Sequence, residues 1–262
     1  MNGVRALDMT RLQGGAGETS VVVEEPLEVR LDGAPVAVTM RTPGQDTELA
    51  VGFLITEGVI RDPAALASAT HCAEDANVVE VRSVPGAAGV EPPRARAFVA
   101  SSSCGVCGKA ALDAVRVRAP DVRGDRTAVS AELILSLPAR LREAQALFAA
   151  TGSLHAAGLF SASGEPLCAR EDIGRHNAVD KVVGWAAMRE RLPLRASVLL
   201  LSGRCGFELV QKALVAGIPI VASISGPSTL AVDLAREAGM TLACFVRGRD
   251  LTLFSAPERI RS

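Results

Sequence analysis

The sequence predicts an α/β protein, because strand and helix patterns alternate along its second half. Apolar runs such as Ser197–Leu201 are typical of strands that are buried on both faces of a sheet. Several are followed by helical patterns that end at a glycine, as at Gly217 and Gly239. This alternation indicates a layered sheet that is at least partly parallel.

The elements expected in this half follow one helical region. That region covers Ser130–Ala149, with a break near Pro138, and ends at Gly152. The expected strands are His155–Phe160, Leu167–Arg170, Ser197–Leu201, Ile218–Ser223, Leu242–Val246 and Leu251–Phe254. The expected helices are His176–Glu190, Phe207–Ala216 and Ser228–Ala238.

The first half predicts a smaller, β-rich α+β unit. Apolar and polar residues alternate on both sides of Asp32-Gly33, which indicates a hairpin with one buried face. A helix is expected over Asp46–Glu57, followed by weak strands at Val78–Val81 and Arg96–Ala100. The expected division is a flexible tail over residues 1–19, the α+β unit over 20–100, a cysteine-bearing loop and linker over 101–125, and the α/β domain over 126–262.

Composition favours a reduced, cytoplasmic protein. The 262 residues are 48% hydrophobic and carry a formal net charge of −1, whereas nucleic-acid binders usually show a basic excess. We therefore expect no nucleic-acid partner. Six cysteines in a chain of this length do not make a disulfide scaffold. No apolar run approaches the roughly 18 residues of a membrane helix, so no membrane is expected either.

The segment Ser101–Lys109 carries two cysteines, Cys104 and Cys107, three positions apart and each followed by a glycine. Val106 is its one apolar side chain, so this cannot be a core segment. Glycine and serine favour an exposed and adaptable loop. A thiol on such a loop, near the charge of Lys109, is typical of reactive rather than structural cysteine.

Three chemistries suit this pair of thiols. It could be half of a structural zinc site, although no second pair of cysteines or histidines has ligand spacing. It could be a thioredoxin-like redox pair, although its strand and helix context is weak. It could also carry sulfur, if a thiolate attacks a sulfane sulfur and holds it as a persulfide. The residues alone leave all three open.

Glycine, hydroxyl and arginine residues follow three of the expected strands. Ligands of open α/β sheets bind beyond the carboxyl ends of the strands. At those ends this chain has Ser202-Gly203-Arg204, Ser225–Thr229 and Arg247–Asp250. Arginines and helix amino termini bind phosphate. The pattern predicts a phosphate- or nucleotide-bearing ligand, although glycines and helix caps also build ordinary tight turns.

A dense polar run, Glu171–Lys181, stands at the start of an expected helix. A capping aspartate would explain Asp172, but not Arg175, His176 and Lys181 as well. Isolated histidines are more often structural than catalytic, so both roles stay open for His155 and His176.

Together these motifs resemble those of the formate dehydrogenase accessory sulfurtransferase family, FdhD/NarQ. They run in family order from about residue 20 to residue 254, and Arg170–Lys181 is the most specific of them. The matching stretches are Met40–Gly44, Glu48–Leu54 with Thr56–Gly58, Ser103–Lys109, Thr151–Ala157, Arg170–Lys181, Ser202–Arg204, Val210–Ala213, Leu230–Val232 and Phe245–Gly248.

The resemblance implies a sulfurtransferase. Such proteins accept persulfide sulfur from a cysteine desulfurase. They pass it to the molybdenum of Mo-bis(molybdopterin guanine dinucleotide), the cofactor of formate dehydrogenase. Cys104 would carry the persulfide, and Cys107 would assist or resolve it. The expected cofactor-binding residues are Phe245, Val246, Arg247, Gly248, Arg249 and Asp250, with Ser228, Arg204 and His176 added from the strand ends.

The resemblance also implies a fold and an assembly. The C-terminal part would be a three-layer α/β/α domain like that of cytidine deaminases, and the protein would form a homodimer. The metal motif of the deaminases is absent, so no metal of its own is expected, and a guanine nucleotide would be a partial mimic of the cofactor. Asp250 departs from the family, which commonly has a basic residue there.

Two other functions stay open from the sequence. One is a chaperone that binds the cofactor without transferring sulfur, and the other is a zinc-dependent hydrolase of nucleotides. The first differs from a sulfurtransferase in whether Cys104 ever holds persulfide sulfur. The second would require stoichiometric zinc.

Overall fold

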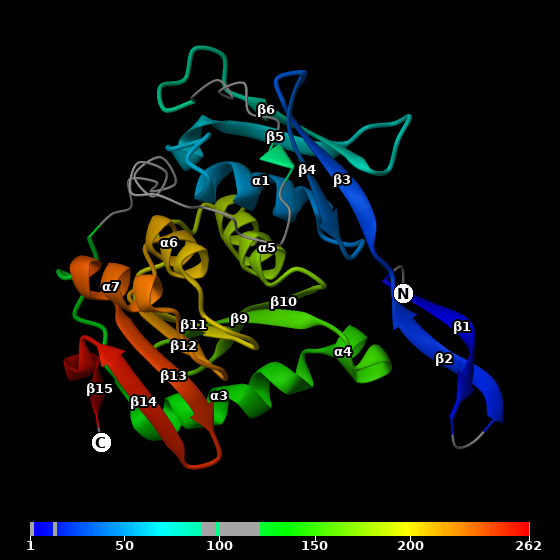
Figure 1. The fold of residues 1–262 in the computed structure, drawn as a ribbon. Helices are drawn as coiled ribbons and strands as arrows, with labels where there is room; N and C mark the ends of the chain where they lie inside the picture. Colours follow the sequence, from blue (N-terminus) through cyan, green and yellow to red (C-terminus); the bar gives the residue numbers. More distant parts are fainter. Residues whose placement is uncertain (1–2, 13–14, 91–97, 100–120, 262) are drawn as a thin grey trace.

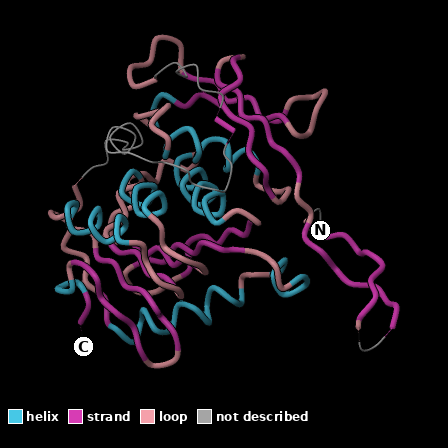
Figure 2. Tube along the Cα trace, viewed as in Figure 1, coloured by secondary structure: helices cyan, strands magenta, loops and turns pink. Residues whose placement is uncertain are grey.

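The computed structural model of the chain describes residues 3–12, 15–90, 98–99 and 121–261. A six-stranded sheet and a five-stranded sheet lie on either side of a layer of helices, and a further helix covers the outer face of the larger sheet (Figure 1 and Figure 2). The α/β class is confirmed by this arrangement, while the specific likeness to cytidine deaminases stays a prediction.

The larger sheet has the strand order β10-β9-β11-β12-β13-β14. Its strands are β9 (His155–Ser161), β10 (Pro166–Asp172), β11 (Ser197–Leu201), β12 (Ile220–Ser223), β13 (Thr241–Arg247) and β14 (Asp250–Ser255). The central three, β11, β12 and β13, run parallel, and the pairs β10–β9, β9–β11 and β13–β14 are antiparallel. All the strands expected in this half are therefore present, close to their expected bounds.

Helices cover both faces of this sheet. The outer helix is α3 (Ala131–Glu143), and the inner layer has α5 (Arg175–Ala187), α6 (Phe207–Val215) and α7 (Thr229–Ala238). Along β11, Val198 and Leu200 join the cluster under α3, whereas Leu199 and Leu201 join the cluster under α5 and α6. Successive side chains of a strand point to opposite faces, so this strand is buried on both.

The break in the first helical region does not fall at Pro138. α3 continues through Pro138 to Glu143, and the interruption comes at Ala144 and Gln145, before α4 (Ala146–Thr151). Proline costs a helix one hydrogen bond, but the buried neighbours Leu137 and Leu141 hold this helix against the sheet. The end at Gly152 is confirmed, and its left-handed φ of 69° is the reason for a glycine there.

The smaller sheet has the order β5-β6-β3-β4-β7. Its strands are β3 (Glu25–Leu31), β4 (Ala34–Arg41), β5 (Leu66–His71), β6 (Val78–Ser83) and β7 (Phe98–Val99). The hairpin at Asp32-Gly33 is confirmed, and both residues have the positive φ that a tight hairpin turn requires. β5 was not predicted, because this edge strand is largely polar or exposed and lacks an apolar alternation.

One hydrophobic core joins the two halves of the chain. It contains Leu27 of β3, Leu49 of α1 (Asp46–Thr56), Val179 of α5 and Leu199 of β11. α1 and α5 therefore lie back to back between the two sheets, as Figure 1 shows. The smaller unit is packed onto the larger one through this core.

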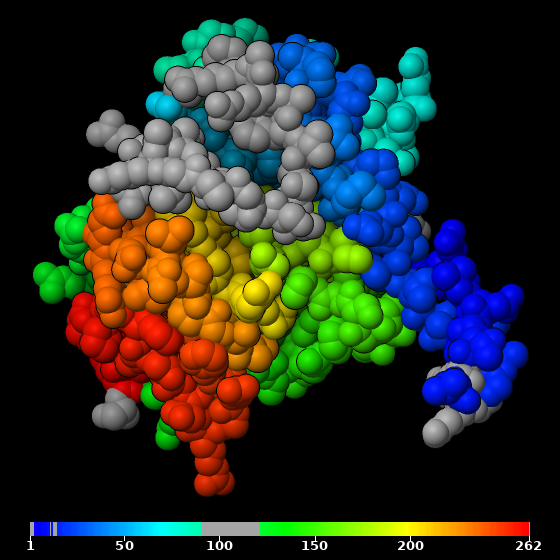
Figure 3. Space-filling view, viewed as in Figure 1, coloured from blue at the N-terminus to red at the C-terminus, as the bar shows by residue number. Residues whose placement is uncertain are grey.

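Residues 1–19 were expected to form a flexible tail, but the structure has a hairpin there. β1 (Val4–Arg11) and β2 (Gly15–Val22) pair antiparallel, from Val4 opposite Val22 to Arg11 opposite Gly15. The ribbon stands out from the body of the molecule (Figure 3). Its β2 side chains are mostly exposed, so no apolar alternation in the sequence indicated a strand.

Short elements complete the described chain. They are η1 (Pro63–Ala65), β8 (Val129–Ser130), η2 (Pro257–Arg259) and β15 (Ile260–Arg261). β15 pairs with β8 in parallel, which ties the end of the chain to the start of α3. Among the helices in the described ranges, none is both long enough and apolar enough to cross a membrane.

Candidate functional site

The predicted ligand residues gather at one edge of the larger sheet. The parallel strands β11, β12 and β13 all end there. β9 is antiparallel to β11, so its first residue, His155, lies at the same edge, and the last residue of β10, Asp172, pairs with it. The turns after these strands are therefore neighbours, as a ligand site beyond the strand ends requires.

Two serines at strand ends, Ser202 after β11 and Ser223 as the last residue of β12, hold the turns rather than face a ligand. Ser202 Oγ accepts a hydrogen bond of 2.8 Å from the Ala156 amide, and the Ser202 amide donates to the Ala156 carbonyl at 3.0 Å. Ser223 Oγ donates to the Gly203 carbonyl at 2.6 Å. These bonds fix the path of the segment that presents Arg204, whose side chain is exposed.

Ser228 caps α7, because its Oγ accepts a hydrogen bond of 3.2 Å from the Ala231 amide. Its own amide donates to the Cys205 carbonyl at 3.0 Å, and the Cys205 amide donates to the Gly226 carbonyl at 3.1 Å. The turns after β11 and β12 are thus joined by backbone hydrogen bonds. Ser228 was predicted as a cofactor-binding residue, and its side-chain oxygen already serves the helix.

Phe245 and Phe254, with Arg247 beside them, form an aromatic patch near the end of β13. Phe245 has a left-handed φ of 55° and its side chain is 38% exposed. Its ring covers Gly226, where an added Cβ would lie 2.7 Å from Phe245 Cζ, so only glycine fits beneath it. The Arg247 guanidinium carbon lies 5.8 Å from the centre of the Phe245 ring, and the Phe254 ring centre lies 6.3 Å from that of Phe245.

The rest of the predicted cofactor-binding stretch divides between surface and core. Val246 is fully buried in the cluster under α3, so its side chain cannot face a ligand. Gly248, Arg249 and Asp250 are exposed and form the turn from β13 to β14. In Figure 3 the tip of this hairpin projects from the lower edge of the molecule.

A second group, the strand-end cluster, consists of His155, Arg175, His176, Arg204 and Glu208. An added Cβ on Gly203, the residue before Arg204, would lie 3.0 Å from His155 Nδ1. His176 Nε2 lies 3.0 Å from Glu208 Oε2, which belongs to the first turn of α6. The hydrogen bond from His176 lowers the pKa of Glu208, so this carboxyl group stays ionised at neutral pH.

His155 and Arg175 belong to the same cluster. Burial of the imidazole lowers the pKa of His155, and the positive charges of Arg175 and His176 lower it further. Arg175 Nε is buried, and within the described residues nothing accepts a hydrogen bond from it. The cluster therefore combines a neutral histidine with a guanidinium Nε that has no acceptor among the described residues.

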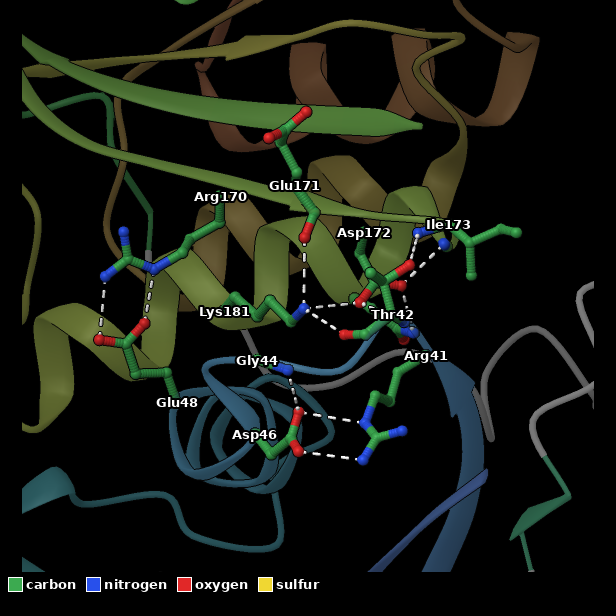
Figure 4. A network of polar contacts seen from close by, with 12 residues as sticks. Arg41, Thr42, Gly44, Asp46, Glu48, Arg170, Glu171, Asp172, Ile173 and Lys181 are labelled. Atoms are coloured by element: carbon green, nitrogen blue, oxygen red, sulfur yellow. Dashed lines mark hydrogen bonds and ion pairs between the residues drawn. The ribbon is translucent and has the colours of Figure 1, made fainter. Parts of the chain in front are cut away.

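The Arg170–Lys181 run divides into two parts, and the larger part faces the smaller unit rather than the strand ends. Lys181 Nζ lies 2.7 Å from Asp172 Oδ2 and donates to the Thr42 carbonyl at 3.0 Å. Arg170 donates from Nε and Nη2 to the two carboxylate oxygens of Glu48 in α1, at 2.6 Å and 3.0 Å. Figure 4 shows these contacts between α5, β10 and the segment after β4. Their role is to join the two units.

Two further contacts extend this structural network. Arg41 binds Asp46 with two hydrogen bonds, of 3.1 Å and 3.0 Å, which fixes the turn before α1 (Figure 4). Lys212 of α6 lies 2.8 Å from Glu57 and 3.0 Å from Asp180. Burial alone would lower the pKa of Lys212, but the charges of Asp180 and Glu57 outweigh it and raise that pKa.

The predicted sulfur-carrying residues, Cys104 and Cys107, lie outside the described residues. Three other cysteines are buried. Burial raises the pKa of Cys168 and that of Cys244, each to about 12, and it also raises the pKa of Cys205. A thiol with a raised pKa is a poor nucleophile, so these three pack as small apolar side chains.

The strand-end cluster and the aromatic patch have groups that suit a nucleotide. The cluster offers hydrogen-bond donors, and the patch offers the exposed ring of Phe245. Within those residues, no group of three or more histidine, cysteine or acidic side chains is placed to hold a metal ion. Glu208 was not predicted as a site residue, because the only feature of the sequence that indicates it is its position shortly after a strand end.

Comparisons with known proteins give these features a context. The FdhD/NarQ family model matches residues 22–261. A sulfur carrier protein FdhD from Mycolicibacterium paratuberculosis is 51% identical over 98% of this chain and 97% of its own length. One from Streptomyces avermitilis is 50% identical over 95% of this chain and 93% of its own.

A solved structure has the same fold. It is the crystal structure of a protein from Desulfotalea psychrophila, provisionally assigned as a formate dehydrogenase accessory protein. The two chains are 26% identical and superpose with a TM-score of 0.76, and the match covers 98% of each. The similarity therefore extends over both sheets and the helices between them.

Proposed function

Because the chain belongs to the FdhD/NarQ family, we propose that it is a sulfur carrier that matures formate dehydrogenase. In detail, Cys104 accepts persulfide sulfur from a cysteine desulfurase. It then passes this sulfur to the molybdenum of Mo-bis(molybdopterin guanine dinucleotide), which is the cargo of the protein. The working assembly is a homodimer. The names of curated relatives about half identical to this chain support the sulfur-carrying role.

The contrast between the cysteines is the observation that carries the proposal. Cys168, Cys205 and Cys244 are buried and their pKa values are raised, so they hold their protons at neutral pH. Cys104 and Cys107 instead occur in a segment of serine and glycine with one apolar side chain. A sulfur-accepting thiolate belongs in that segment.

The loading step balances without any added oxidant. The Cys104 thiolate attacks the outer sulfur of the donor persulfide, the sulfur–sulfur bond of the donor breaks, and the donor cysteine leaves as a thiolate. In delivery, the Cys107 thiolate attacks Sγ of Cys104, and the outer sulfur leaves at the sulfide level for molybdenum. The chain is left with a Cys104–Cys107 disulfide, which a cellular thiol reductant must reopen.

The cofactor is held, in this proposal, beyond the strand ends. The exposed ring of Phe245 offers a stacking face for guanine, and the neighbouring Arg247 and Arg249 offer donors for phosphate. Asp250 in the same turn carries the opposite charge, so it weakens rather than supports the grip on phosphate.

The proposal predicts which cysteine is loaded. The chain is incubated with a cysteine desulfurase and cysteine, and its mass is measured without reduction. We expect the mass of one extra sulfur atom on the parent chain and on Cys107→Ala, and none on Cys104→Ala. Cys72→Ala, which changes a half-buried cysteine elsewhere, serves as the matched control and should load normally. Unchanged loading of Cys104→Ala would sink the proposal.

A further inference from the structure

The β1–β2 ribbon has an apolar strip along one of its faces. Residues directly opposite each other in an antiparallel pair point to the same face, as do residues two apart in one strand. Leu7 pairs with Thr19, and Met9 pairs with Gly17. Leu7 is 40% exposed, and an added Cβ on Gly17 would lie 3.5 Å from Met9 Cε. Leu7, Met9 and Val21 therefore share one face of the ribbon, which we call the arm strip.

The ribbon has little support from the rest of the described chain. Its two strands form a sheet of their own, so among the described strands neither outer edge has a neighbour. At its base, an added Cβ on Gly3 would lie 3.0 Å from Thr42 Cγ2 and 3.1 Å from Leu147 Cδ1, but the tip stands free of the body (Figure 3). An isolated two-stranded hairpin is marginally stable in water. A further surface that covers the arm strip would stabilise the ribbon.

A second exposed apolar surface, the outer patch, lies on the smaller sheet. Leu27 of β3 is fully buried on the inner face of this sheet. On the outer face, Pro26 pairs with Met40 and Glu28 with Val38. Val38 and Met40 are each 45% exposed, and Pro26 is exposed as well. A sheet face turned to solvent is usually polar, so three neighbouring apolar side chains there indicate a contact surface.

The ribbon cannot cover the outer patch of its own chain. β2 ends at Val22 and β3 starts at Glu25, so only Val23 and Glu24 separate the two strands. The ribbon extends from one end of β3 and away from the sheet, as Figure 1 shows. The outer patch lies on the face of that sheet. A patch of this kind that the ribbon can reach therefore belongs to a second copy of the chain.

Exposed charges of opposite sign border the two surfaces. Arg5 pairs with Val21, so it lies on the same face of the ribbon as the arm strip, and it is exposed. Glu24 is exposed just before β3, and Glu28 lies directly opposite Val38 on the outer face. Complementary charges at the rim of an interface favour one orientation of the partners.

We propose that two copies of the chain exchange their ribbons, each packing its arm strip against the outer patch of the other. This inference rests on the homodimer of the proposed function and names the surfaces that form it. Leu7 and Met9 pack against Val38 and Met40, with Arg5 beside the acidic side chains. A twofold axis relates the two contacts, so the assembly closes at two copies. Each ribbon thereby gains the surface that the described part of its own chain does not provide.

The mass of the full chain in solution, measured by light scattering over a range of concentrations, tests the exchange. The parent chain should be a dimer. Leu7→Asp on the arm strip and Val38→Asp on the outer patch should each raise the dissociation constant of the dimer at least about a hundredfold, because each would bury a charge without a partner. The matched controls are Met188→Asp and Val84→Asp, at apolar side chains of similar exposure outside both surfaces, and they should remain dimers.

Mixing the two interface variants tests whether the contact is reciprocal. The Leu7→Asp copy keeps an intact outer patch, and the Val38→Asp copy keeps an intact arm strip, so one of the two contacts can form between them. The mixture should therefore form heterodimers more tightly than either variant dimerises alone. If the ribbons paired with each other instead, Val38→Asp would remain a dimer.

A dimer of either variant that is as tight as that of the parent chain would overturn the proposal, and so would a mixture without heterodimers. A monomeric parent chain would overturn the homodimer of the proposed function as well. Sulfur loading on Cys104, followed by mass in the same variants, should stay normal and reports on the sulfur-carrying role by itself.

Discussion

At the residue scale, the site depends on how neighbouring charges set the state of single side chains. His155 is half-buried, and its pKa is lowered first by burial and then by Arg175 and His176. A histidine of this kind is neutral at physiological pH and presents a hydrogen-bond donor without adding to the positive charge. Glu208 is held ionised by the opposite effect, the hydrogen bond from His176.

The state of His155 gives a direct prediction. The chain has three histidines, so their ring signals can be followed by NMR through a pH titration. His155 should titrate below the ordinary value of about 6.5. In Arg175→Gln its pKa should rise, because a positive charge that opposes protonation is removed. The control is Arg195→Gln, at an exposed arginine just before β11, and it should leave the pKa of His155 unchanged. A His155 that titrates unchanged in Arg175→Gln would show that the two side chains are not neighbours.

At the scale of elements, the crossing of α1 and α5 positions the whole site. The two helices touch at Gly52 and Gly184, where an added Cβ would overlap the backbone carbonyl of Asp180 or of Glu48. Each glycine therefore lets the partner helix approach to backbone contact. Because α5 also starts at Arg175, this crossing fixes the position of Arg175 and His176 in the strand-end cluster.

Adding one methyl group at Gly184 tests the close packing of α1 against α5. In an exposed helix, replacing glycine with alanine stabilises a protein by up to about 1 kcal/mol. Gly184→Ala should instead destabilise the chain by about 3 kcal/mol, because the methyl group overlaps backbone that cannot rotate away. Urea unfolding measures the difference. The control is Gly124→Ala, at a glycine with open space around it, which should stay within about 0.5 kcal/mol of the parent. An equally stable Gly184→Ala would contradict the described packing.

A feature could be predicted from the sequence when the interactions that form it are local in the chain, and could not when they join distant segments. The hairpin at Asp32-Gly33 and the buried strand Ser197–Leu201 were predicted because turn chemistry and apolar runs are local signals. The continuation of α3 through Pro138 was not, because distant packing decides it. The β1–β2 ribbon was missed because it has little apolar pattern to display.

The site shows the same limit. Strand order cannot be read from local patterns, so the sequence indicated Arg204 and His176 but not their relation to His155 and Glu208. The Arg170–Lys181 run looked like one polar site, whereas the fold turns Arg170 and Lys181 towards α1 and the segment after β4. Only contacts between distant segments show which of these polar side chains join the two units and which lie at the strand ends.

At the scale of the whole molecule, two units share one core and are joined by buried ion pairs. Arg170 of β10 binds Glu48 of α1, and Lys212 of α6 binds Glu57, the residue after α1. Removing one member of such a pair is costly, because the other is left buried and unpaired. The two units are thus held in a fixed relation to each other.

The central claim is that this molecule moves sulfur from Cys104 to the molybdenum of formate dehydrogenase. The most direct measurement loads the chain with radiolabelled sulfur, removes the donor, and mixes it with dehydrogenase whose cofactor lacks sulfur. The account predicts that label moves to the cofactor and formate oxidation appears together, and that Cys104→Ala supports neither. Activation by Cys104→Ala equal to that by the parent chain, with label left on the parent, would contradict it.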